Sequence, residues 1–184
     1  IEKQFLLSIA YHSSRSGNVS EKVIYSWEWG DGTKYSPDFD VIHDIGLKIA
    51  NLTFKDAVDG STYDPTTSKS IKGNAHDWFY TETGCIQYLI ETGTSNMQSI
   101  DSTHVYQIKE DNFNGAFYLF NRAWGNSNNS SLSADKYQIT GIVTDAVTGE
   151  TVHASVKILE MDGSVLKPRF TDNFGRYRRL LNGG

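Results

Sequence analysis

The chain is short of several features, and each shortage excludes a class of protein. Among 184 residues there is one cysteine, which excludes an internal disulfide and a cysteine-rich zinc module. No apolar run approaches the ~20 residues that a membrane-spanning helix needs. Lys and Arg number 17 against 22 Asp and Glu, a net charge of −5, so no basic excess favours nucleic acid as a partner.

The chain also lacks an initiating methionine and a signal-like segment. It begins with Ile1, so we expect it to lie inside a longer protein whose targeting is not written in this stretch. Hydrophobic residues make up 38% of the chain and aromatic residues 12%, which is too apolar for a disordered chain. The sequence therefore predicts a folded domain.

The first 125 residues have the pattern of an α/β domain. Residues 5–11 and 86–90 are almost continuously apolar, as in strands buried on both faces of a sheet. Residues 36–38 start a predicted helix in which apolar side chains recur at helical spacing. A second helix is predicted from about 105 to 124, and we expect its aromatic stripe to belong to the core. The members of this stripe are Ile108, Phe113, Phe117, Phe120 and Trp124.

Turn-forming residues define the rest of the chain. Residues 56–74 are rich in Ser, Thr, Asp and Gly with little periodicity, and they are predicted to form a long functional loop. Residues 126–136 are polar and of low complexity, which is typical of a linker. Residues 137–184 alternate short apolar runs with Gly and Asp turns, which indicates the start of an all-β sandwich.

Two polar residues follow the predicted buried strands, where α/β sheets present functional groups. His12 follows the first strand, and Glu91 follows the strand over 86–90. A neutral imidazole is able to bind a metal ion, and a carboxylate beside that metal is able to accept a proton from water. A lone strand-end His is more often structural, and a lone strand-end Glu is usually solvated. Taken alone, the two residues leave both interpretations open.

The segment between these two residues carries a family resemblance. Residues 73–80 have the pattern Gly-x-x-x-Asp-Trp-x-Tyr and precede the strand that ends at Glu91. This arrangement resembles the M14 family of zinc metallocarboxypeptidases, in its regulatory branch of the carboxypeptidase E, N and D type. Residues 7–14 are similar to the family's strand that carries the third zinc-binding His. Residues 141–145 and 171–177 are similar to the transthyretin-like, or carboxypeptidase regulatory-like, domain that follows the peptidase domain.

The resemblance implies a fold and a reaction. It implies an α/β, partial zinc-carboxypeptidase fold over residues 1–125, with a mixed sheet and flanking helices. The linker over 126–136 and a truncated all-β sandwich over 137–184 would follow. The implied protein is a secreted or periplasmic hydrolase, a metalloprotease that removes residues from the C-terminus of a peptide or protein substrate. The implied chemistry uses one zinc ion, a zinc-bound water and a glutamate general base.

The resemblance also implies roles for individual residues. It makes His12 a zinc ligand and Glu91 the catalytic base that takes the proton of the attacking water and returns it to the leaving amine. Ser13 and Asp77 would bind substrate.

Two further positions depart from the family's pattern. His76 stands where the family lines its specificity pocket, which favours polar or acidic C-terminal residues; packing against Trp78 is the alternative role. Eight residues before Asp77, where the family has a mobile Tyr, the chain has Lys69. Either Lys69 or Tyr63 takes that role in binding substrate, or the donor is lost.

The family's His-x-x-Glu zinc pair is absent from this sequence. None of the five His residues has Glu three positions later, so the chain supplies one of the three protein ligands that catalytic zinc needs. We expect the other ligands in the N-terminal half of the same domain, and we expect these 184 residues alone to be inactive. Two other functions stay open: an inactive pseudo-peptidase that binds peptides or mediates adhesion, and an M14 enzyme that acts on peptidoglycan peptides.

Overall fold

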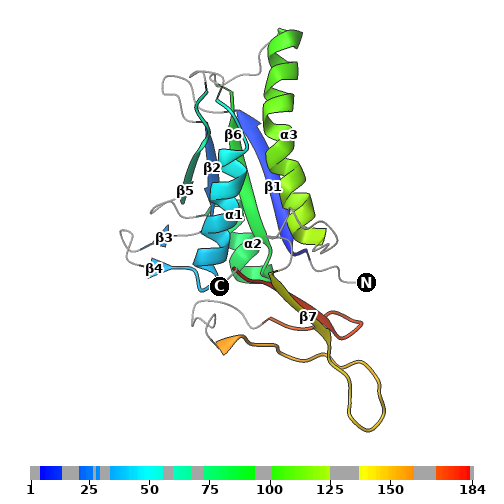
Figure 1. Ribbon diagram of the computed structural model, residues 1–184. Coiled ribbons are helices and arrows are strands. Elements are labelled where there is room, and N and C mark those ends of the chain that lie inside the picture. Colours follow the sequence, from blue (N-terminus) through cyan, green and yellow to red (C-terminus); the bar gives the residue numbers. More distant parts are fainter. Residues whose placement is uncertain are drawn as a thin grey trace.

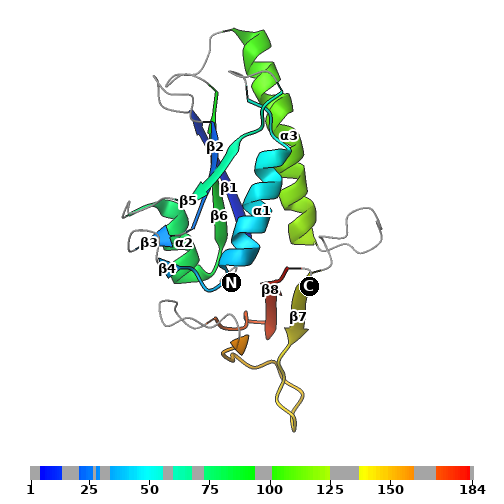
Figure 2. The same cartoon turned by 60° about the vertical axis from the view of Figure 1, so that its left-hand side comes forward.

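The computed structural model describes residues 5–13, 21–26, 28–29, 34–55, 60–67, 73–93, 101–124, 137–159 and 169–182. Its larger part is a sheet with helices beside it, and a smaller β region follows (Figures 1 and 2). The larger sheet contains β1 (Leu7–Ser13), β2 (Lys22–Tyr25), β5 (Asp64–Thr67) and β6 (Ile86–Thr92). The helices are α1 (Phe39–Asn51), α2 (Ala75–Thr83) and α3 (Ser102–Trp124). Two short antiparallel pairs complete the described elements: β3 (Glu28–Trp29) with β4 (Lys34–Tyr35), and β7 (Gln138–Ile142) with β8 (Arg176–Leu180).

The larger sheet is mixed, with the strand order β1-β6-β2-β5. β1 is parallel to β6 and β2 is parallel to β5, whereas β2 and β6 are antiparallel. The α/β class and the mixed sheet predicted from the sequence are therefore confirmed. β6 forms from the run over 86–90 and is mostly buried, as predicted. β1 forms from the run over 5–11, but it is an outer strand among the described strands and its residues are half-buried or exposed, so the prediction that it is buried on both faces is wrong.

α1 forms where the apolar spacing predicts a helix, and it buries most of the predicted stripe. The last two predicted members, Leu52 and Phe54, lie beyond the end of the helix, and Phe54 is 46% exposed. Gly46 lets α1 approach the sheet closely, because a Cβ at this position would lie 2.6 Å from the Tyr25 ring. Tyr88 of β6 lies on the same face and donates a hydrogen bond from its hydroxyl to the Ile42 carbonyl, at 3.0 Å. The core thus lies between α1 and one face of the sheet. Its most buried apolar members on α1 are Val41, Ile42, Ile45, Ile49 and Ala50.

α3 corrects the expectation that its aromatic stripe is core. The helix spans the predicted region but turns its other face to α1, where Gly115 would bring a Cβ within 3.0 Å of Ile49. Its buried residues are Asn112, Gly115, Tyr118, Leu119 and Arg122. Four of the five stripe residues are instead more than half exposed: Phe113, Phe117, Phe120 and Trp124. The absence of a side chain at Gly115 allows the close approach that selects this face.

The predicted long loop over 56–74 is also corrected in part. Residues 64–67 form β5, which pairs with β2 at the edge of the sheet. An edge position tolerates Pro65, since proline has no N–H to donate to a neighbouring strand. The Gly-x-x-x-Asp-Trp-x-Tyr motif over 73–80 contains the start of α2. The helix ends at Gly84, which has the left-handed conformation (φ 79°) that glycine adopts without strain.

The smaller β region packs on the end of the larger part. β7 lies where the alternating pattern predicts a strand, and its partner is β8. Leu180 of β8 is 3% exposed and belongs to the same apolar cluster as the residues of α1 and β6. Among the described residues, none of the helices combines the length and the apolar character needed to span a membrane.

Candidate functional site

The structure brings His12 and Glu91 together on neighbouring strands. β1 and β6 run parallel in a register that pairs His12 with Glu91. Residues opposite each other on paired strands point to the same face of a sheet. The distance between His12 Nε2 and Glu91 Oε1 is 3.8 Å. Both side chains lie near the carboxyl ends of their strands, where the sequence placed them.

The pair lies on the face of the sheet away from α1. Tyr88 and Ile90 of β6 are buried in the core beneath the helix. Side chains alternate along a strand, so Glu91 points to the opposite face. The same face carries a bond between the strands at the other end of the register, where Gln87 Nε2 donates to Ser8 Oγ at 3.1 Å. Backbone pairing and this side-chain bond together fix the relative position of the two strands.

The imidazole of His12 is oriented by its own strand end. The ring Nδ1 lies 2.7 Å from the backbone carbonyl oxygen of Ser13. A carbonyl only accepts, so in the neutral ring Nδ1 carries the hydrogen and Nε2 carries the lone pair. A histidine that binds a metal commonly donates its other ring N–H to a backbone carbonyl in this way. His12 therefore fits a metal ligand that binds through Nε2, the nitrogen nearest Glu91.

The sequence did not identify a row of charged side chains that continues from Glu91 across the sheet. In the antiparallel pair, Lys22 of β2 is opposite Glu91, and in the next pair it is opposite Asp64 of β5. Asp64 in turn accepts a bond from Lys55 Nζ at 2.7 Å. The row thus alternates in charge and places a cation on the side of Glu91 away from His12. Lys22 begins an apolar run, but its register partner depends on residues far along the chain.

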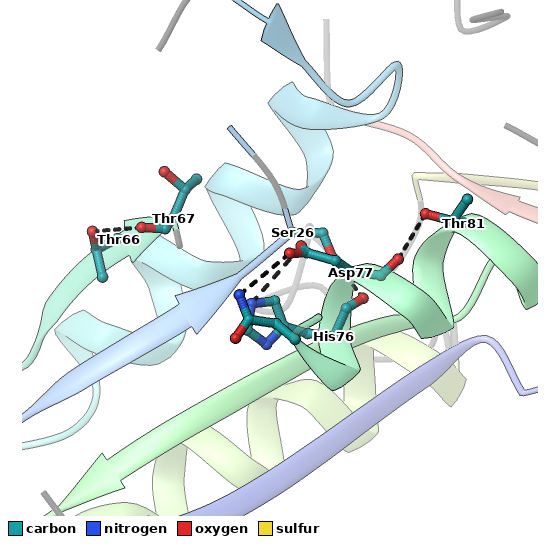
Figure 3. A network of polar contacts seen from close by, with 7 residues as sticks. Ser26, Thr66, Thr67, His76, Asp77 and Thr81 are labelled. Carbon is teal, nitrogen blue, oxygen red and sulfur yellow. Dashed lines mark hydrogen bonds and ion pairs between the residues drawn. The ribbon is translucent and has the colours of Figure 1, made fainter. Parts of the chain in front are cut away.

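His76 and Asp77 form a second group in the first turn of α2 (Figure 3). The Ser26 hydroxyl donates to the His76 carbonyl at 2.8 Å, and Asn74 Nδ2 donates to Asp77 Oδ2 at 3.4 Å. His76 Nε2 lies 3.8 Å from Asp77 Oδ1. The His76 side chain is buried, and this loss of water lowers its pKa from 6.5 to about 4, so it is neutral at pH 7.

This second group lies beside the first residues of β6, whereas the His12–Glu91 pair lies near the end of that strand. Ser26 follows Tyr25, whose register partner Tyr88 lies three residues before Glu91, or about 10 Å along a strand. The sheet therefore carries two separate groups of predicted site residues.

Two other predicted residues, Tyr63 and Ser13, point away from both groups. Tyr63 is 2% exposed and belongs to the core, where its hydroxyl accepts a bond from Asn112 Nδ2 of α3 at 3.4 Å. Ser13 follows His12 in β1, so alternation turns its side chain to the other face of the sheet. Lys69 lies outside the described residues.

A scan against protein-family models finds no match for the chain, and a search of the curated proteins finds none either. Within the ranges that the structure describes, no group of three or more His, Cys, Asp or Glu side chains is placed to hold a metal ion.

Proposed function

We propose that this chain carries part of the catalytic centre of a zinc-dependent metallocarboxypeptidase. In this proposal His12 binds the zinc ion and Glu91 is the general base. The supporting observation is the strand register that pairs the two residues, with His12 Nε2 3.8 Å from Glu91 Oε1. The hydrogen bond from His12 Nδ1 to the Ser13 carbonyl supports the proposal too, because it leaves Nε2 as the ligating atom.

Each residue has a separate task in the proposed reaction. A zinc ion bound here would polarise the scissile carbonyl and acidify a water molecule. Glu91 accepts the proton of the attacking water on a carboxylate oxygen and delivers it to the amine that leaves. Its side chain is 14% exposed, so little bulk water competes for that proton. The backbone register holds Glu91 beside the ligand, so its position does not depend on a flexible loop.

The other two ligands of such a centre would come from residues outside this chain. His12 offers zinc one imidazole, whereas catalytic zinc sites use three protein ligands. The proposal thus assigns the site to the longer protein that the family resemblance implies. The experiment has to use that intact protein.

The test compares two variants of the intact protein for zinc content and for hydrolysis of acylated dipeptides. Glu91→Gln should keep zinc and lower kcat by about 10²- to 10⁴-fold, because it removes the proton acceptor but retains the shape. His12→Ala should lose zinc and activity together. Matched controls are Glu150→Gln and His153→Ala, two exposed residues of the smaller β region that should keep both. Turnover at the wild-type rate by Glu91→Gln would contradict the proposal.

A further inference from the structure

α2 depends on other elements for its position. It has nine residues, and isolated helices shorter than about 12–15 residues are only marginally stable in water. Its last turn contains no basic residue, so the helix itself supplies no cation for the partial negative charge at its carboxyl end. α2 lies at the end of the larger part that faces the smaller β region (Figures 1 and 2). A cation from that region is therefore in place to stabilise it.

Arg169 of the smaller β region supplies this cation. Its Nη2 donates a hydrogen bond to the Tyr80 carbonyl at 2.7 Å, and the guanidinium carbon lies 5.3 Å from the centre of the Tyr80 ring. Gly84, which ends α2, leaves space for this side chain, because a Cβ there would lie 2.6 Å from Arg169 Nε. The Arg169 backbone is fixed in turn, since its carbonyl accepts a bond from the Val156 N–H at 2.9 Å. The carboxyl end of α2 is thus held from the smaller β region.

A second arginine of the smaller β region acts on the hydroxyl of the same tyrosine. The Tyr80 hydroxyl donates to Asp38 Oδ2 at 2.8 Å, and Arg179 Nη2 donates to Asp38 Oδ1 at 2.6 Å. Tyr80 is 0% exposed, so water does not replace a bond that is lost here, and an unsatisfied buried group is costly. Tyr80 is therefore fixed at its carbonyl and at its hydroxyl.

Tyr80 shares its short helix with two predicted substrate-binding residues. His76 and Tyr80 are four residues apart, so they lie on the same face of α2, and both are buried. His76 and Asp77 belong to the first turn, where the Ser26 hydroxyl donates to the His76 carbonyl at 2.8 Å (Figure 3). α2 has only about two and a half turns, so a shift or rotation at Tyr80 also moves the residues of the first turn.

We propose that Arg169 is a positioning residue for substrate binding. By holding α2 through Tyr80, it keeps the turn that contains His76 and Asp77 in the place where the C-terminal residue of the substrate binds. This inference rests on the proposed function, and it gives the smaller β region a part in substrate recognition. The proposed zinc ligand and general base lie on β1 and β6, so Arg169 should affect substrate binding more than the chemical step.

The test measures hydrolysis of acylated dipeptides by the intact protein and amide hydrogen exchange of residues 75–83. Arg169→Met should raise KM about 10-fold and leave kcat within about twofold, because it loosens the binding turn and not the catalytic pair. The same substitution should accelerate amide exchange in α2. Arg169→Lys, which returns a cation to the helix end, should restore both values. A loss of stability alone would not separate KM from kcat in this way.

The matched control removes the same kind of contact from a helix that contains no predicted site residue. Arg178 Nη1 donates to the Ala123 carbonyl in the last turn of α3, at 2.8 Å. Arg178→Met should therefore keep the wild-type KM and the wild-type exchange of α2. Circular dichroism checks that each variant is folded. Arg169→Gln, which keeps a hydrogen-bond donor without the charge, replaces Arg169→Met if that variant unfolds.

The outcomes distinguish this inference from the proposed function. A wild-type protein that holds no zinc and hydrolyses no dipeptide would overturn the proposed function, and this inference with it. Four results would overturn this inference alone: turnover by Arg169→Met at the wild-type KM, unchanged exchange of α2 in that variant, an Arg169→Lys variant that behaves like Arg169→Met, or an equal rise of KM in Arg178→Met.

Discussion

Two histidines of the larger part lie beside carboxylates, and they differ in the exposure of their side chains to water. The His12 side chain is 46% exposed and keeps its Nε2 toward Glu91. The His76 side chain is 3% exposed beside Asp77, and this burial lowers its pKa. A neutral His76 offers a hydrogen bond and no positive charge at neutral pH.

The buried His76 makes stability depend on pH. Its pKa is about 4 in the folded chain and about 6.5 when unfolded, so between these values the unfolded chain binds a proton that the folded chain does not. The contribution of neutral His76 to the free energy of unfolding is complete above pH 6.5 and is lost as the pH falls toward 4. We expect the free energy of unfolding to drop by about 2–3 kcal/mol from this source between pH 7 and pH 4.5. Urea unfolding at the two pH values measures it.

Two glutamine variants isolate this effect. His76→Gln should flatten the pH dependence, whatever its own stability at pH 7. His153→Gln changes an exposed histidine of the smaller β region and should keep the wild-type slope. Identical slopes in His76→Gln and the wild type would show that the lost stability comes from other groups.

At the scale of the element, the position of α1 depends on a missing side chain. A Cβ at Gly46 would lie 2.6 Å from two ring atoms of Tyr25 and 3.3 Å from the Tyr88 ring. Tyr25 is 2% exposed and Tyr88 is fully buried, so neither ring has room to withdraw. Gly46→Ala should therefore cost about 1–3 kcal/mol of unfolding free energy, although alanine in a helix is normally favoured by about 1 kcal/mol.

Chemical denaturation of two alanine variants checks the Gly46 prediction. Asn51→Ala, at the exposed end of the same helix, should change stability by no more than about 0.5 kcal/mol. If Gly46→Ala were more stable than the wild type, the close approach of α1 to the sheet would not be the reason for glycine at this position.

Elements defined by local pattern were predictable, and those defined by distant contacts were not. Apolar runs and helical spacing lie within a few residues, so β1, β6 and α1 follow from the sequence. Whether residues 64–67 become a strand depends on β2, and which face α3 buries depends on the approach of Gly115 to α1. The candidate site divides in the same way. Strand ends indicated His12 and Glu91 separately, whereas Lys22 enters the row only through the register of β2 and β6.

At the scale of the whole molecule, arginine side chains join the smaller β region to the larger part. Arg122 of α3 donates to the Leu181 carbonyl at 2.6 Å, and Arg169 donates to the Tyr80 carbonyl at 2.7 Å. Planar guanidinium groups suit this task because they donate several bonds in fixed directions. The two parts are therefore held by directed polar contacts as well as by apolar packing.

The pair between Arg179 and Asp38 is a buried ionic contact of this junction. Arg179 Nη2 lies 2.6 Å from Asp38 Oδ1, with side chains 15% and 8% exposed, and the Tyr80 hydroxyl donates to the other oxygen of Asp38 at 2.8 Å. Arg179→Met would leave a buried carboxylate with one donor fewer, so we expect a loss of about 3 kcal/mol.

Calorimetry of matched variants measures this loss. Arg176→Met, which breaks an exposed pair with Asp172 inside the smaller β region, should change the unfolding temperature much less. The double variant of Asp38→Asn with Arg179→Met should lose less than the two single changes together, because it leaves no unpaired charge. Equal losses for Arg176→Met and Arg179→Met would mean that the buried pair does not hold the two parts together.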